Sequence, residues 1–142
     1  MARDPSAQVA DLRTVAALDE ARALAALARL RADIDNLRRT HAGLREEAAA
    51  ARRAAGADPL SGHAAEQLCR WAEQRQMALN LKLAKLHMAQ EEAAQRAQRA
   101  VGRGDALIQL AHRLAQQRHR LSESRRLAEG SAGVRVLPHL DE

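Results

Sequence analysis

The sequence predicts an all-α protein in which two long helices pack as an antiparallel coiled-coil hairpin, the second helix being longer than the first. The first observation behind this is composition: the 142 residues include 34 Ala and 20 Leu, but one Trp and no Phe or Tyr. Aromatic side chains normally supply much of the buried area of a globular core, so composition argues against sheet proteins and compact enzymes. Alanine, leucine and arginine instead favour helices. The other two observations are the placement of proline and glycine, and a seven-residue apolar repeat.

The first helix is predicted over 5–55. Asp4 is a suitable N-cap, and Pro5 suits the first helical position, where its missing N–H is not needed. Gly56 can end the helix in the left-handed conformation. A tight turn is therefore expected over 56–58.

The second helix is predicted over 59–129. The pair Asp58-Pro59 repeats the start signal of the first helix. Gly130 and a second glycine three residues later are expected to end it. The remaining residues, 130–142, are expected to form a flexible tail.

Apolar residues recur in steps of three and four in both predicted helices, as in a coiled coil. In the first helix the predicted seam holds Leu27, Leu30, Ile34, Leu37, His41, Leu44, Ala48, Ala51 and Ala55. In the second helix one seam position holds Leu79, Leu86, Ala93, Ala100, Leu107, Leu114, Leu121 and Ala128. The other position holds Leu83, Gln90, Ala97, Gly104, Ala111, Arg118 and Arg125. Before Leu27, the positions of Val9, Leu12 and Ala16 predict a slip in register.

A short turn makes the two helices antiparallel neighbours. If 55 faces 59, the numbers of facing residues add to about 114. Ile34 then lies near Leu79, Leu27 lies near Leu86, and small residues near Ala100 face the beginning of the first helix. About 20 residues of the second helix, or about 30 Å, would extend beyond the first.

This overhang is predicted to begin near Leu110, and its leucines have no expected partner within the hairpin. Leucine gains about 1.5–3 kcal/mol from burial, so we expect another surface to cover them. That surface is either a partner protein or the residues Val134, Val136 and Leu137 of the tail. Arginines in the stripe disfavour a tight dimer of two overhangs and favour an acidic or carbonyl-rich partner. The candidate partner-binding residues are Leu110, Leu114, Arg118, Leu121, Arg125 and Leu127.

Residue patterns for catalysis, cofactors or metals are not found in the sequence. The six histidines, at 41, 63, 87, 112, 119 and 139, include no pair at the i, i+4 spacing of a helical metal site. Cys69 has no partner thiol and is expected to pack in the interior. We therefore expect no enzyme activity, no catalytic residues, no cofactor and no metal.

Five arginines and one glutamate lie within 113–126, which raises the possibility of nucleic-acid binding. Leucines run through this stretch, however, and the chain has no set of aromatic residues for stacking on bases, so we do not expect nucleic acid as a partner. The longest apolar run, 23–28, is far too short for a membrane helix. With no signal peptide evident at the N-terminus, the expected location is cytoplasmic.

The layout resembles the FliJ family of flagellar type III export proteins and the related YscO-like stalk proteins of injectisomes. The resemblance covers most of the chain. It consists of an all-helical hairpin with a polar turn, the stretch Leu68-Cys-Arg-Trp71 early in the second helix, and the run Gln98-Arg-Ala-Val-Gly-Arg-Gly-Asp-Ala-Leu107-Ile-Gln-Leu110 late in it. Family members carry several aromatic residues around the hairpin tip, whereas Trp71 stands alone here.

The resemblance implies a non-enzymatic stalk that inserts into the hexameric export ATPase and contacts the export gate, at the inner face of an export apparatus. Leu68 and Trp71 are then the candidate gate contacts. The alternative is a free-standing coiled-coil scaffold or dimerisation module, and a helical nucleic-acid binder is the weaker third reading.

Overall fold

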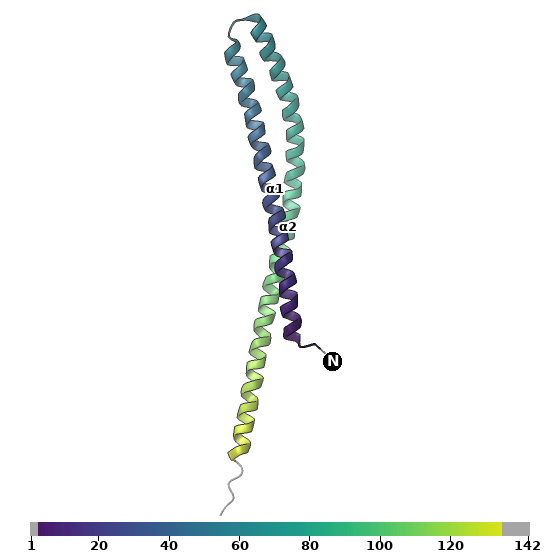
Figure 1. Cartoon of the computed structure of the whole chain (residues 1–142), viewed down its shortest axis with the longest axis vertical. Helices are drawn as coiled ribbons and strands as arrows, with labels where there is room; N and C mark the ends of the chain where they lie inside the picture. The colour runs from purple at the N-terminus through teal and green to yellow at the C-terminus, as the bar shows by residue number, and fades with distance from the viewer. Residues whose placement is uncertain (1–2, 135–142) are drawn as a thin grey trace, which may run out of the picture. The chain divides into compact units, whose positions relative to one another are not determined.

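The computed structural model describes residues 3–134 and consists of two long helices joined by a short turn. Helix α1 spans Pro5–Ala55 and helix α2 spans Pro59–Val134. They pack against each other as a hairpin, with α2 the longer helix (Figure 1). The all-α class and the predicted bounds of the first helix and of the turn are confirmed.

Aspartate caps begin both helices. The Asp4 carboxylate accepts a hydrogen bond from the backbone N–H of Ser6 (3.1 Å). At α2, the Asp58 carboxylate accepts hydrogen bonds from the Ser61 hydroxyl (2.7 Å) and the backbone N–H of Leu60 (3.4 Å). These bonds satisfy donors that have no partner within the first turn of a helix, and they hold the pKa of Asp58 below its ordinary value.

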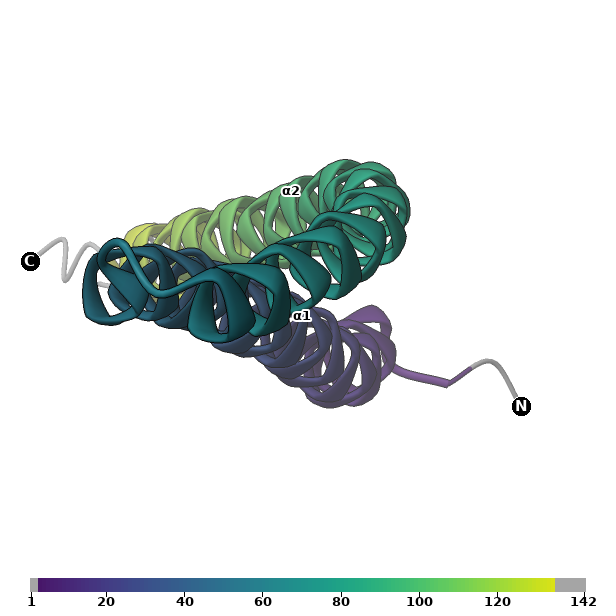
Figure 2. The same cartoon turned by 90° about the horizontal axis from the view of Figure 1, so that it is seen from above.

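Gly56 ends α1 with a φ of 54°, in the left-handed region that glycine enters without steric cost. Figure 2 shows the short connection from this point to the beginning of α2. The turn is tight because one left-handed residue reverses the chain and the Asp58 cap starts the next helix at once.

The predicted end of the second helix at 129 is wrong, because α2 continues to Val134. Gly130 and Gly133 both lie within the helix and have no positive φ. A single glycine costs only about 1 kcal/mol relative to alanine inside a helix, so good neighbouring helix formers can carry the helix past it. The Ser131 hydroxyl also donates to the carbonyl of Ala128 (2.9 Å). Of the predicted tail, residues 135–142 lie outside the described residues.

The chain divides into two compact units. The turn unit, Glu20–Ala100, contains the end of α1, the turn and the beginning of α2. Its core includes Leu27, Ala93 and Ala97, which pack with the partly buried Ala23, Leu30 and Ala94. Within the described range, the terminal unit contains residues 3–19, which include the beginning of α1, and residues 101–134 of α2.

The predicted seam is confirmed in α1 from Leu27 to Ala55 and in α2 from Leu79 to Leu114, because these positions are buried or half-buried. The later predicted positions, Arg118, Leu121, Arg125 and Ala128, are exposed. The predicted slip before Leu27 is wrong. Val9 and Ala16 are buried and in the same three–four register as Leu27, whereas Leu12 is exposed. The seam positions between Val9 and Leu27 include the polar residues Arg13 and Glu20, which obscure the repeat in the sequence.

The predicted pairing of facing residues is also wrong. In the turn unit the Cys69 thiol donates to the carbonyl of Ala48 (3.8 Å), and those residue numbers add to 117 rather than 114. Leu27 packs with Ala93 rather than lying opposite Leu86. Side chains lean toward the N-terminus of their own helix, so in an antiparallel pair contacts join residues with higher numbers on both helices.

Candidate partner-binding surface

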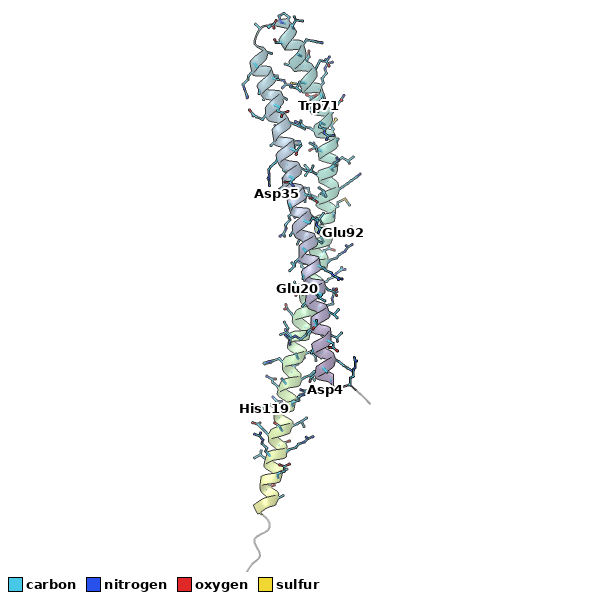
Figure 3. All side chains as sticks on the ribbon, in the orientation of Figure 1. Asp4, Glu20, Asp35, Trp71, Glu92 and His119 are labelled. Atoms are coloured by element: carbon cyan, nitrogen blue, oxygen red, sulfur yellow. The ribbon has the colours of Figure 1, made fainter. Side chains whose placement is uncertain are left out.

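Within the terminal unit, the last strong contact between the helices joins Asp4 to Arg118. The Arg118 guanidinium donates to both carboxylate oxygens of Asp4, at 2.8 and 2.7 Å. Figure 3 labels Asp4 at the beginning of α1 and His119 on α2. We call residues 119–134 the free end of α2, since they follow this contact. At about 1.5 Å per residue they extend for about 24 Å.

The prediction that the overhang begins near Leu110 is therefore wrong. Val9 of α1 and Leu114 of α2 line the same groove, so Leu114 has a neighbour within the hairpin. The predicted pairing placed Val9 opposite residues near Gly104. The observed pairing is shifted by roughly two turns, which shortens the overhang by the same amount.

The six predicted partner-binding residues occupy three different environments. Leu114 is half-buried, and Arg118 is bonded to Asp4. Leu110 is 43% exposed and lies before the free end. Leu121 and Leu127, at 60% and 75% exposed, lie on the free end with the exposed Arg125. Three of the six, Leu121, Arg125 and Leu127, thus lie beyond the Asp4–Arg118 contact and are exposed.

A groove of about 150 Å³ lies between the helices beside the Asp4–Arg118 pair. Arg13 and Arg118 supply its charged groups, and Val9 and Leu114 supply its larger apolar side chains. Its full lining is Ser6, Val9, Ala10, Arg13, Ala111, Leu114, Ala115 and Arg118. The groove places apolar and cationic groups next to the first residue of the free end.

The Asp4 carboxyl has its pKa held below its ordinary value, first by the Ser6 backbone N–H and then by the Arg118 guanidinium. A carboxyl whose pKa is lower in the folded than in the unfolded state stabilises the fold above its unfolded pKa. That contribution is lost as pH falls through the folded pKa. The contact between Asp4 and Arg118 is therefore expected to weaken only in strong acid.

We expect the Asp4 pKa to rise in Arg118→Gln and yet stay below its ordinary value, because the Ser6 N–H remains. An NMR pH titration of the Asp4 carboxyl carbon measures this. Arg113→Gln is the matched control, since Arg113 is an exposed arginine of the same helix, and it should leave the pKa unchanged. An Asp4 pKa that is the same in Arg118→Gln and in the wild type would show that the contact does not persist in solution.

The candidate gate contacts, Leu68 and Trp71, lie in the turn unit. Trp71 is 52% exposed, and Figure 3 labels it on α2. Gly43, the glycine that the predicted pairing places opposite it, has open space where a Cβ would stand. Leu68 is half-buried and lines a groove of about 300 Å³ between the helices.

A second apolar stripe on α2 was missed by the sequence reasoning. Met77, Leu81 and Met88 are all exposed, and their spacing places them on one face of the helix, away from the seam. The signal was available in the sequence, because residues four and seven apart share a helix face. The turn unit therefore exposes a second apolar face, whose methionines are flexible and polarizable.

Among residues 3–134, no group of three or more His, Cys, Asp or Glu side chains could hold a metal ion. Cys69 is buried as predicted. His41 occupies its predicted seam position and is half-buried. Neither described helix has a stretch long and apolar enough to cross a membrane.

Comparison with protein-family models, with curated proteins and with solved structures found no match to this chain.

Proposed function

We propose that this chain is a non-enzymatic coiled-coil component of a type III protein export apparatus, similar to FliJ, and that the free end of α2 binds the export ATPase ring. The observation that carries the proposal is that α2 continues for 16 described residues past its bond to Asp4. Those residues present Leu121 and Leu127 to solvent. Exposed leucines are costly in water, which favours a protein partner at this end.

The hairpin design itself supports a stalk. Its two helices bury small side chains along a narrow seam, and each exposes charged residues on its remaining faces. Such a seam is typical of a coiled coil, which leaves its charged faces available to partner proteins. On this proposal the Trp71 region of the turn unit contacts the export gate, since a half-exposed tryptophan is typical of a binding anchor.

The proposal is tested by co-purifying the chain with the export ATPase of the same organism. Leu121→Asp is expected to reduce ATPase binding at least tenfold, because it places a carboxylate in the apolar stripe. Ser122→Asp introduces the same charge at the next exposed position and should leave binding near the wild-type level. Circular dichroism should show unchanged helix content for both variants, since both side chains are exposed. Wild-type ATPase binding by Leu121→Asp would refute the stalk assignment.

A free-standing dimerisation module is the second candidate, and the exposed stripe of Met77, Leu81 and Met88 is the observation that favours it. Sedimentation equilibrium separates the two. A concentration-dependent dimer that Leu81→Asp dissociates supports the module, whereas a monomer at all concentrations supports the stalk.

A further inference from the structure

The seam of α2 continues in register beyond the part that α1 covers. One seam position holds Leu107 and Leu114, which are half-buried, and then Leu121 and Ala128, which are exposed. The other seam position holds Arg118 and then, one heptad later, Arg125. The free end therefore repeats the surface on which α1 packs, without α1 on it.

The pair of Asp4 and Arg118 shows how this surface binds a neighbouring helix. Asp4 caps α1 and at the same time accepts two hydrogen bonds from the seam arginine of α2. Arg125 stands at the equivalent seam position, is exposed, and forms no ion pair within residues 3–134. A second carboxylate, one heptad further along, would give Arg125 the partner that Arg118 already has.

We propose that the free end of α2 is the vacant half of a two-stranded coiled coil, and that its occupant is an acidic amphipathic helix supplied by the partner protein. The occupant places apolar side chains on Leu121 and Ala128 and a carboxylate on Arg125. It thereby continues the seam where α1 begins. The proposal rests on the proposed function, because it specifies what the partner presents to this end of the chain.

Charge decides between this occupant and a second copy of the chain. Two free ends packed together would bring the seam arginines of both copies into one interface, where like charges repel. The stretch 113–126 carries five arginines against one glutamate, and Glu123 already lies 3.5 Å from His119. An acidic helix meets no such repulsion, and arginine can donate two hydrogen bonds to each carboxylate, as Arg118 does.

The test uses the full chain and a synthetic helical peptide of about three heptads, with leucine at its seam positions except for one glutamate, at the seam position that faces Arg125. A matched peptide carries lysine in place of that glutamate. Fluorescence anisotropy measures the binding of each peptide. The glutamate peptide is expected to bind at least tenfold more tightly than the lysine peptide, since like charges placed opposite each other oppose association.

Two charge reversals on α2 then locate the contact. Arg125→Glu is expected to weaken binding of the glutamate peptide about tenfold and to strengthen binding of the lysine peptide. Arg126→Glu makes the same change in net charge at the adjacent exposed residue, outside the seam, and should alter both affinities less than twofold. Both side chains are exposed, so neither reversal should change the helix content measured by circular dichroism.

Several results would overturn the inference. Equal binding of the two peptides, or equal losses of affinity from Arg125→Glu and Arg126→Glu, would mean that the peptides bind through general charge attraction and not through a seam contact. A dimer of the chain that Leu121→Asp dissociates would make a second copy the occupant. Tight binding of a DNA duplex at about 200 mM salt, lost in Arg125→Glu, would make nucleic acid the occupant.

The experiments distinguish failure of the acidic-helix site from failure of the proposed function. If the glutamate peptide binds as expected but the export ATPase does not, the stalk assignment fails and the acidic-helix site stands. If the ATPase binds through Leu121 but the peptide shows no charge preference, the stalk assignment stands and the acidic-helix site fails.

Discussion

Replacing Leu79 with alanine is expected to lower the free energy of unfolding by about 2–4 kcal/mol. Leu79 is 3% exposed and occupies the seam of the turn unit. Truncation removes apolar contacts and leaves a cavity that two stiff helices can only partly close. Urea unfolding followed by circular dichroism measures the change.

The matched control is Leu81→Ala, two residues along the same helix. Leu81 is 60% exposed, so its truncation should change the free energy of unfolding by less than about 0.5 kcal/mol. The two substitutions remove the same atoms from equally helical positions. Equal effects of both would contradict the seam assignment and mean that the chain packs differently in solution.

Enlarging Ala97 to leucine is expected to cost about 1–3 kcal/mol of unfolding free energy, although leucine is an excellent helix former. Ala97 is 4% exposed and packs in the cluster with Leu27 and Ala93. The added side chain has no space there unless the two helices move apart and lose their neighbouring contacts.

Ala84→Leu provides the control for this enlargement, because Ala84 is exposed on the same helix. It should leave the thermal midpoint nearly unchanged, while Ala97→Leu should lower it by several degrees. A stabilised Ala97→Leu protein would show that the alanine-rich part of the seam is loosely packed and that added apolar volume improves it.

The ends of α1 and the beginning of α2 could be predicted because local chemistry determines them. Asp4, Pro5 and Gly56 each have one suitable place in a helix, and the structure uses them there. The C-terminal end of α2 could not be placed in the same way. Gly130 permits a helix end but does not require one, so its neighbours decide the outcome.

The seam was predictable wherever its residues are apolar, since a repeat of seven requires no knowledge of the partner helix. The prediction of the seam was wrong near the beginning of α1, where Arg13 and Glu20 occupy seam positions and the exposed Leu12 lies nearby. Long charged side chains can lie along a seam with their ends in water, and a hydrophobic pattern alone does not register them.

The extent of the candidate surface could not be read from the sequence because it depends on which residues face each other. Leu114 and Leu121 look equivalent in the repeat, yet only Leu114 lies beside α1. The lean of side chains toward their own N-terminus shifts the pairing along both helices, and the Asp4–Arg118 contact sets the last point of packing.

The buried thiol of Cys69 gives the protein a built-in chemical reporter of hairpin opening. Its sulfur is directed at the Ala48 carbonyl across the seam, and it is the single cysteine in the chain. Cys69 is 4% exposed, so a thiol reagent should react with it slowly in the closed hairpin and faster when the turn unit opens. A ligand that clamps the two helices together near Trp71 would slow that labelling, and a ligand that separates them would accelerate it.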